Sequence, residues 1–382
     1  MTPAAAGGSV YPTEAAAPPT VGVEEEFVLA DRQSRSAVHR SLPVVSAARA
    51  HLGGPHVTPE LAESQVETVS AVCRTAAELE AEIRRLRTGA AAAAAEYDCL
   101  LVPSGMAVLG RSGPPPVLDQ ERYRALARRF GPVVHGQGVN ACHVHVGVAE
   151  REEAVQAVNH LRGWMPLLLA LTANSPYSDG ADTGYASWRS MVWSRWPSAG
   201  PPPYLRDAAH YAWVVDQLVA TGAALDPAMV YWHVRPSAHL PTIEVRVADV
   251  LPDAGTTTAY ALLVRALVGH AVETVRTGER APEVPELLLR AACWQAARHG
   301  TTGTLPATHM RECVPMAVGR LIEELWKRVE PQLSRYGDDR RVSAWLRDVQ
   351  LAGTGAARQR RVAEKDQDGL RAVVDDLAVE AP

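Results

Sequence analysis

Apolar and polar residues alternate in several stretches of the chain, and this alternation predicts strands with two unlike faces. Successive side chains on a strand point to opposite sides. Within residues 21–29, Val21 and Val23 therefore share an apolar face, while Glu24 and Glu26 share the other. Two carboxylates on one strand face stand about 6–7 Å apart. This spacing suits divalent cations, and without a cation the two charges repel.

A third carboxylate, Glu25, falls on the apolar face of the same strand. A buried charge needs a partner. We expect it to pair with an arginine on a helix behind the sheet, and the candidates are Arg84, Arg85 and Arg87.

Three later stretches, residues 63–72, 140–148 and 241–249, repeat this design. The solvent-exposed face of an antiparallel sheet is polar whether or not it holds a site, and it usually carries a mixture of Lys, Thr, Ser and Gln. These faces instead supply acids, imidazoles and one arginine, which favours a site over a solvated surface. Their polar residues are Glu63, Gln65 and Glu67, then His143 and His145, and then Glu244 and Arg246.

Longer stretches have the periodicity and end signals of helices. Thr75, followed by Glu78, predicts a capping box at the start of one of them. The chain therefore reads as α+β, with a mostly helical C-terminal half and a long irregular stretch at residues 175–204. Helices are predicted at residues 42–52, 75–97, 119–130, 150–172, 208–221, 254–277, 285–298, 315–336, 338–351 and 356–377, and short strands at 100–102 and 229–234.

Composition limits the function classes. The 382 residues carry a net charge of -5, which argues against nucleic acid as a partner. The five cysteines form no C-x-x-C pair, so we expect a reducing cytoplasm rather than a disulfide framework. No apolar run is long enough to cross a membrane. Residues 1–20 are rich in Ala and Pro and predict a disordered tail, and residues 21–382 predict one catalytic domain.

If the four strands join in one sheet, one face holds about five carboxylates, two histidines and a guanidinium. Such a density of acids is costly without cations. Oxygen ligands fit Mg²⁺ or Mn²⁺, and two or three ions are expected. Several divalent ions beside an arginine are typical of sites that bind a nucleoside triphosphate and transfer a phosphoryl group. The chain has no G-x-x-x-x-G-K-[ST] loop, so metals would hold the phosphates.

Eight short segments, in order along the chain, resemble the carboxylate–amine ligases of the glutamate–cysteine ligase type 2 group. Any one of them is weak, but together they are specific. They are GVEEEF (22–27), ESQVE (63–67), CHVHVG (142–147), GYASWR (184–189), WPSAGP (196–201), TIEVRVAD (242–249), WQAAR (294–298) and GTGAARQR (353–360).

The resemblance implies a glutamine-synthetase-like fold, with a curved antiparallel sheet, the active site on its concave face and helices on the other side. It also implies ATP-dependent formation of an amide through an acyl phosphate, from small-molecule carboxylate and amine substrates, with glutamate and cysteine as the reference pair. A homo-oligomer is compatible with it. Residues 103–107 depart from the segment with Thr and His that the family usually shows, which leaves the substrates open.

Site roles follow from the matched positions. The resemblance implies catalytic roles for Arg246, Glu244 and His143. The implied metal ligands are Glu24, Glu26, Glu63, Glu67, Glu244 and His143; the implied nucleotide contacts are His143, His145, Arg246, Arg358 and Arg360; the candidate substrate contacts are Arg189, Arg195, Arg235, Trp188 and Tyr185.

Three other functions stay open on the residues alone. A guanidino-kinase-type phosphotransferase would use a related sheet and release a phosphorylated product. A metal-dependent hydrolase would hold Zn²⁺ with His143, His145 and a glutamate. A non-catalytic binder would keep the pocket without turnover.

Overall fold

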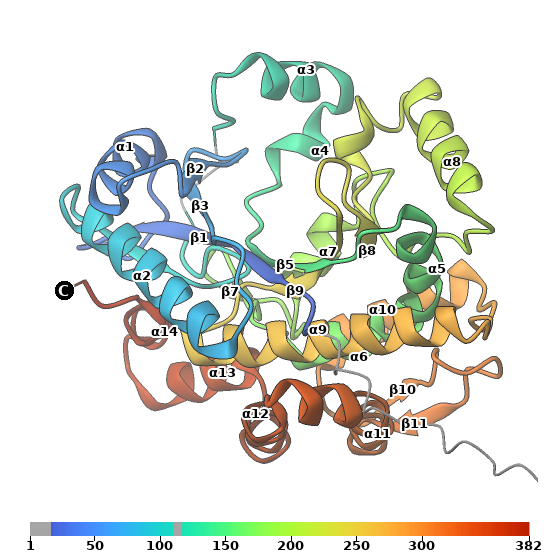
Figure 1. The fold of residues 1–382 in the computed structure, drawn as a ribbon. Helices are drawn as coiled ribbons and strands as arrows, with labels where there is room; N and C mark the ends of the chain where they lie inside the picture. The colour runs from blue at the N-terminus through green and yellow to red at the C-terminus, as the bar shows by residue number, and fades with distance from the viewer. Residues whose placement is uncertain (1–16, 111–115, 382) are drawn as a thin grey trace, which may run out of the picture.

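A computed structural model describes residues 17–110 and 116–381, and an antiparallel sheet of seven strands lies at its centre (Figure 1). The strand order is β2-β3-β1-β5-β9-β8, and β4 pairs with β1. The α+β prediction is therefore confirmed. The strands are β1 (Val21–Asp31), β2 (Val57–Pro59), β3 (Gln65–Val69), β4 (Cys99–Val102), β5 (Ala141–Gly147), β8 (Val234–Pro236) and β9 (Thr242–Asp249).

The register of this sheet brings the predicted polar residues together. Glu24 of β1 lies opposite His143 of β5, and Glu26 lies opposite Glu67 of β3. On the next pair of strands, His145 lies opposite Glu244 of β9. Because side chains directly opposite each other share a face, one face collects acids from three strands and both imidazoles.

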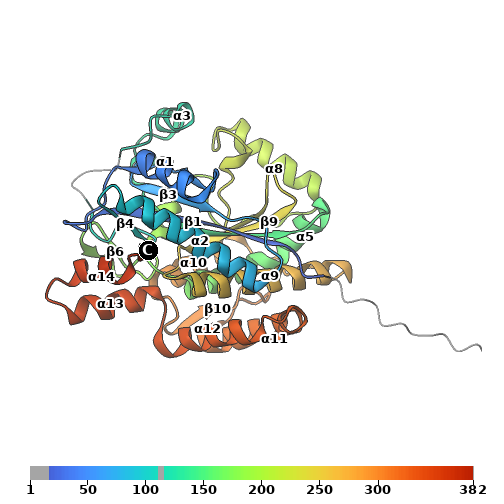
Figure 2. The ribbon, with the colours of Figure 1, turned by 60° about the vertical axis from the view of Figure 1, so that its left-hand side comes forward.

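Helices cover the other face of the sheet, where the apolar side chains of the strands point. Val21 and Val23 are 1% and 3% exposed and belong to the largest hydrophobic cluster. Thr75 caps α2 through the predicted capping box with Glu78. In Figures 1 and 2, α2 and the long α9 run beneath the sheet. These helices are α1 (Ser41–Leu52), α2 (Ala76–Ala95), α5 (Arg151–Leu161), α6 (Met165–Leu171) and α9 (Ala254–Arg276).

The chain after β9 is mostly helical, as predicted, and two of its later helices, α11 and α12, lie below α9 (Figure 1). Its one hairpin among the described residues is β10 (Thr304–Pro306) with β11 (Pro315–Ala317). The remaining helices are α10 (Glu286–His299), α11 (Val318–Tyr336), α12 (Asp339–Ala352), α13 (Gly355–Lys365) and α14 (Gly369–Leu377).

A smaller set of elements, which we call the cap, lies over the polar face, and two of its helices, α3 and α8, are at the top of Figures 1 and 2. Leu126, Val134, Trp196, Ala224 and Met229 form its hydrophobic cluster. The cap comprises α3 (Glu121–Phe130), α4 (Pro132–His135), α7 (Trp188–Trp193), α8 (Ala208–Ala220) and the 3₁₀ turn η2 (Pro227–Met229).

Several predicted boundaries differ from the structure. The helix expected at 150–172 is broken by the 3₁₀ turn η1 (Arg162–Trp164), and the tail helix is two helices, α13 and α14. The strand expected at 229–234 is only Val234–Pro236. The irregular stretch 175–204 contains α7 and the small hairpin of β6 (Tyr177–Ser178) and β7 (Ala181–Asp182). The unordered tail was predicted for residues 1–20; residues 1–16 lie outside the described residues, and Thr20 pairs with Gly147 at the end of β5.

The last helices connect back to the sheet through polar contacts. Gln359 of α13 donates from Nε2 to the main-chain oxygen (3.0 Å) and to Oδ1 (2.8 Å) of Asn174. The main-chain nitrogen of Asn174 donates to Asp249 at the end of β9 (2.8 Å). Asp249 also accepts hydrogen bonds from the hydroxyls of Ser175 (2.7 Å) and Ser187 (2.8 Å). The loop that leads into α7 is thereby held between β9 and α13.

Glu25 pairs with an arginine behind the sheet, as expected, and the arginine is Arg87 of α2. The guanidinium donates from Nε to Oε2 (2.9 Å) and from Nη2 to Oε1 (2.6 Å). Both residues are buried, at 2% and 4% exposure. Thr257 of α9 adds a third hydrogen bond to Oε1 at 2.7 Å.

None of the helices in the described ranges is long and apolar enough to cross a membrane.

Candidate active site

A cavity of about 240 Å³ opens between the polar face of the sheet and the cap. The sheet contributes charged side chains from four neighbouring strands, and the cap contributes aromatic ones. We call this space the acidic cavity. Its charged and imidazole lining consists of Glu24 and Glu26 (β1), Glu60 (before β3), Glu67 (β3), His143 (β5), Arg246 (β9) and Arg122 (α3).

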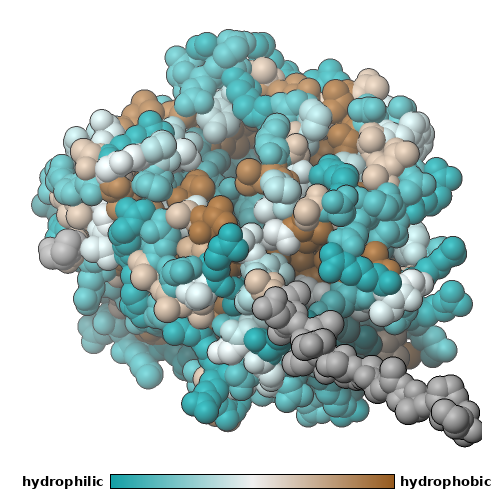
Figure 3. Space-filling model, in the orientation of Figure 1, coloured by the Kyte–Doolittle hydropathy of each residue, from teal (hydrophilic) through white to brown (hydrophobic). Residues whose placement is uncertain are grey.

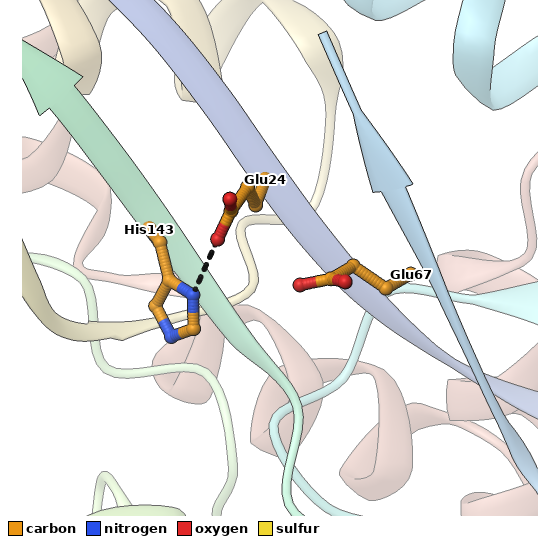
Figure 4. A group of neighbouring side chains, drawn as sticks. All are labelled: Glu24, Glu67 and His143. Carbon is orange, nitrogen blue, oxygen red and sulfur yellow. Dashed lines mark hydrogen bonds and ion pairs between the residues drawn. The ribbon is translucent and has the colours of Figure 1, made fainter. Parts of the chain in front are cut away.

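Two histidines stand against the first of these carboxylates. His143 Nδ1 lies 3.1 Å from Glu24 Oε2 (Figure 4), and His145 Nε2 lies 3.4 Å from Glu24 Oε1. His143 Nε2 is 3.9 Å from Glu26 Oε1. Glu26 is fixed in turn by the main-chain N–H of Ala141, which donates to Oε2 at 2.7 Å. The adjacent strands thus set the spacing of these groups.

Three overlapping groups of side chains could each hold a metal ion, because their ligand atoms lie within 4.8 Å of one another. Glu24 belongs to two groups and Glu67 to two, so the groups form a continuous row across the sheet. Figure 4 shows Glu24, Glu67 and His143 reaching toward one point from three strands. The groups are Glu24, Glu67 and His143; Glu24, His145 and Glu244; and Glu26, Glu60 and Glu67.

Crowding of these carboxylates changes their acidity. Burial and the charges of Glu26 and Glu24 raise the pKa of Glu60 to about 8. Burial and the charge of Glu60 also raise the pKa of Glu67 well above its ordinary value. Burial would raise the pKa of Glu24 as well, but hydrogen bonds with His143 and His145 outweigh it and hold that pKa well below the ordinary range. Glu60 and Glu67 therefore lack a hydrogen-bonded positive partner of the kind that Glu24 has.

The imidazole of His143 stays neutral near pH 7, because burial and then the charge of Arg246 lower its pKa. A neutral imidazole can offer a lone pair to a metal. His145 is fixed by Thr242, whose Oγ1 lies 3.0 Å from Nδ1, and its buried Nε2 faces Glu24 Oε1 at 3.4 Å.

On β9, Glu244 lies between two arginines. Arg235 Nε is 2.8 Å from Glu244 Oε2, and Arg246 Nη1 contacts Oε1. Burial would raise the pKa of Glu244, but the charges of Arg246 and Arg235 hold it well below its ordinary range. Burial would lower the pKa of Arg246, and Glu244 raises it overall. A fixed positive charge therefore faces the acidic cavity from β9.

The donor set fits divalent cations. Four carboxylates line the cavity beside a neutral histidine, and the Nε2 atom of His145 lies next to one of them. These groups match the oxygen and nitrogen ligands of Mg²⁺ or Mn²⁺.

The structure brings all but one of the predicted metal ligands together. Glu63 precedes β3 and belongs to none of the three groups, although its strand partner in the prediction, Glu67, does. Glu60 takes part instead. Strand alternation missed it because Glu60 lies in the connection between β2 and β3, where a period of two no longer applies. Its only signal in the sequence is an acid shortly before an acidic strand.

The arginines predicted to clamp a substrate lie elsewhere. Arg189 is 2% exposed and donates to the main-chain oxygens of Val247 (3.3 Å) and Arg246 (3.2 Å). Arg235 donates to Glu244 and to main-chain oxygens in the cap. Arg195 is exposed beside Gly136. None of the three lines the acidic cavity.

The remaining predicted residues lie outside the acidic cavity. Arg358 pairs with Asp376 (2.8 Å), and Arg360 pairs with Asp182 (2.7 Å) and lines a separate cavity at the start of α13. Tyr185 and Trp188 contact each other, with ring centroids 5.2 Å apart, and neither lines the acidic cavity.

Known proteins resemble the chain over nearly its whole length. The family model of glutamate–cysteine ligase family 2 matches residues 20–376. A Saccharopolyspora erythraea protein provisionally named glutamate–cysteine ligase 2-1 is 45% identical over 363 residues, covering 94% of each chain. A Salinispora arenicola protein, provisionally named glutamate–cysteine ligase 2, is 44% identical over 370 residues, covering 94% of each chain.

Solved structures share the fold at low sequence identity. Glutamate–cysteine ligase from Francisella tularensis, in complex with AMP, has a TM-score of 0.71 at 13% identity and covers 94% of this chain and 88% of its own. The ligase PafA, in complex with the ubiquitin-like protein Pup, has a TM-score of 0.55 at 10% identity, covering 95% and 73%. These likenesses confirm the predicted fold. With the family match and the relatives above, they lead to one assignment: the chain belongs to glutamate–cysteine ligase family 2 and is a ligase of that family.

Proposed function

We propose that this protein uses ATP to join a small-molecule carboxylate to an amine, through an acyl phosphate formed in the acidic cavity. The observation that carries the proposal is the row of three overlapping ligand groups beside Arg246. A cluster of divalent cations next to a fixed guanidinium suits the binding and transfer of a phosphoryl group.

Two or three Mg²⁺ or Mn²⁺ ions would be held by the carboxylates and imidazoles of these groups. Such ions supply positive charge to the phosphates of ATP and to the reacting carboxylate. The ligands would be Glu24, Glu26, Glu60, Glu67, Glu244, His143 and His145.

Arg246 is the group of this chain best placed to stabilise charge on the transferred phosphoryl group. Its Nη1 contacts Glu244, which aims the guanidinium, and its buried Nε has no hydrogen-bond partner among the described residues. A donor without a partner can bind an oxygen that becomes more negative in the transition state. Glu244 is thus a positioning residue for Arg246 as well as a candidate ligand.

The reaction takes place in two steps. An oxygen of the substrate carboxylate attacks the γ-phosphorus, the bond to the β–γ bridging oxygen breaks, and ADP leaves. The amine nitrogen then attacks the acyl carbon, and the carbon–oxygen bond to phosphate breaks. Net, one amide, ADP and inorganic phosphate form.

The comparisons support ligation over phosphoryl transfer to a guanidine, metal-dependent hydrolysis or simple binding. The relatives' names support glutamate as the carboxylate and cysteine as a first amine to test, and the AMP in the Francisella tularensis structure supports an adenine nucleotide as substrate. A cytoplasmic location remains a prediction, supported by five free cysteines.

Hydroxylamine trapping tests the proposal. Purified protein with ATP, Mg²⁺, glutamate and hydroxylamine should form a hydroxamate, together with ADP in equal amount. Hydroxylamine is small and captures acyl phosphates without needing a shaped amine site. If folded protein forms neither hydroxamate nor ADP with any carboxylate of a broad panel, the proposal is wrong; a stable phosphorylated product in mass spectra would instead identify a phosphotransferase.

A further inference from the structure

A second cavity, of about 410 Å³, lies at the start of α13, and we call it the basic cavity. In Figures 1 and 2, α13 lies on the side of the sheet away from α3 and α8. Three of the eight family-like segments, at residues 184–189, 294–298 and 353–360, contribute to its lining, and none of the three lines the acidic cavity. Its volume is in the range of small-molecule sites, about 300–1,000 Å³.

The charge of the basic cavity is positive. Three arginines and a histidine line it, and no carboxylate is among its described lining residues. Arg360 is compensated by Asp182, at 2.7 Å. Arg298 and Arg361 form no ion pair with a described carboxylate, and Arg361 Nη1 donates only to the main-chain oxygen of Ala352, at 2.6 Å. Two uncompensated guanidiniums therefore attract an anion.

Two further donors come from the start of α13, which is a helix of 11 residues. Thr354 directly precedes the helix, is 7% exposed and lines the basic cavity, yet its hydroxyl has no hydrogen-bond partner among the described residues. The main-chain N–H of Ala357, in the first turn, likewise has no acceptor within the described ranges. The N–H groups at the start of a helix carry partial positive charge and bind anions.

Small residues leave room for a ligand to approach the main chain. At Gly184, where φ is +74°, a Cβ would lie 3.0 Å from Arg298 Nη1. At Gly300, where φ is +58°, a Cβ would lie 3.0 Å from the Cβ of Ala186. Hydrophilic residues predominate on the lower part of the molecule in Figure 3, where α12 and α13 lie. Close approach of a ligand to glycines beside a helix start is the common arrangement of phosphate sites.

We propose that the basic cavity binds a phosphate group, either of a small phosphorylated metabolite or as inorganic phosphate. A phosphate group offers three acceptor oxygens and a charge of about -1.5 to -2. Two guanidiniums, the Thr354 hydroxyl and the Ala357 N–H can bind these oxygens together, whereas a carboxylate has only two oxygens and one charge. The site is separate from the acidic cavity, and its occupation does not depend on the proposed function.

Calorimetric titration of the full chain tests the proposal. The buffer contains EDTA and no nucleotide, because without divalent cations the carboxylates of the acidic cavity repel phosphate. The probes are inorganic phosphate, glycerol 3-phosphate and, for comparison, glutamate. We expect one phosphate group to bind per chain, and more tightly than glutamate. Tighter binding of glycerol 3-phosphate would identify a metabolite as the source, and tighter binding of inorganic phosphate would identify the free ion.

The same titration can overturn the proposal. If neither phosphate compound binds at about 10 mM, a concentration that detects even weak complexes, the basic cavity is not a phosphate site. If glutamate binds as tightly as both phosphate compounds, the site does not select phosphate, and the proposal is equally wrong.

Variants locate the binding. Arg298→Gln and Arg361→Gln should each raise the Kd for phosphate about tenfold, because each removes a charge-assisted hydrogen bond. Thr354→Val keeps the side-chain shape and should raise the Kd by a smaller factor, and Thr354→Ser should restore it. If Arg298→Gln fails to fold, the exposed Arg361 still gives the answer.

Arg358→Gln is the matched control. Arg358 lies on the same helix, pairs with Asp376 and does not line the basic cavity, so its loss should leave the Kd unchanged. If Arg358→Gln weakens binding as much as Arg361→Gln does, the phosphate is held by the general charge of α13 and the proposal is wrong. Unchanged binding in both Arg298→Gln and Arg361→Gln would also overturn it.

Discussion

Glu25 and its neighbours Glu24 and Glu26 are consecutive carboxylates, yet the two faces of β1 use them in opposite ways. Behind the sheet, Glu25 has a two-point ion pair with Arg87 and a hydrogen bond from Thr257, so its charge is fully compensated by the protein. In front, Glu24 and Glu26 share a cavity with Glu60 and Glu67, where acids outnumber bases. Strand geometry alone decides which carboxylate stabilises the fold and which is left to bind a ligand.

The difference shows how a compensated charge can be told from a functional one. Removing one member of a buried ion pair leaves the other unpaired and destabilises the fold. Removing a carboxylate from a crowd of carboxylates relieves repulsion, so stability is kept or gained while function is lost. Substitutions behind the sheet should therefore lower stability, whereas substitutions of the front carboxylates should lower activity more than stability.

The largest expected effect is on turnover at the front face. Glu24→Gln should lower kcat about a thousandfold or more, because Glu24 belongs to two of the three ligand groups. The free energy of unfolding without metal should fall only modestly, because His143 and His145 lose a carboxylate partner. Glu63→Gln is the matched control, since Glu63 belongs to no ligand group. A Glu24→Gln protein with near-original hydroxamate formation would contradict the metal assignment.

The next effect is on stability at the back face. Arg87→Met should reduce the free energy of unfolding by about 3–5 kcal/mol, because Glu25 stays buried without its partner. Urea denaturation measures this loss. The double variant Glu25→Leu with Arg87→Met should recover most of it, since an apolar pair of similar volume needs no charge compensation. A single variant as stable as the original protein would show that Glu25 is already neutral or solvated.

The smallest expected effect is on the pH dependence of stability, and it comes from the carboxylates of the front face. The pKa of Glu60 is about 8 in the folded protein against an ordinary 4.5, so the folded state binds more protons in this window. Stability of the metal-free protein should therefore fall as pH rises from about 5 to 8, by on the order of 1–3 kcal/mol.

Two measurements sharpen this prediction. Saturating Mg²⁺ should raise the melting temperature most near pH 8, because cations replace the protons, and Glu60→Gln should flatten the pH dependence. A melting temperature of the metal-free protein that rises from pH 5 to 8 would contradict the raised pKa.

The sequence predicted the sheet side of the site well, because a period of two ties residue number to face. It placed Glu24, Glu26, Glu67, His143, Glu244 and Arg246 on one face and expected Glu25 to pair with an arginine behind the sheet, with Arg87 as one of three candidates. It failed where the backbone leaves the strand: Glu60 lies in a connection, and Glu63, two residues before β3, lies outside the ligand groups.

The arginines show a second limit. A sequence gives the charge of Arg189, Arg195 and Arg235 but not what each guanidinium contacts, and main-chain oxygens or Glu244 occupy two of them. The aromatic lining of the cavity was likewise out of reach, because Tyr123, Trp193 and Tyr231 come from three separate segments of the chain and meet only through tertiary packing.

The hydrogen bonds from Gln359 to Asn174 have a consequence for synthesis of the protein. All of the acidic ligands precede β9 or lie on it, so they leave the ribosome long before α13. The loop between α6 and α7, which contains Asn174, gains its last polar contacts only when α13 docks. A chain that stops within α12 would hold every proposed metal ligand and still lack the support of that loop. The nascent enzyme should therefore acquire activity only after α13 has been synthesised and has docked on this loop.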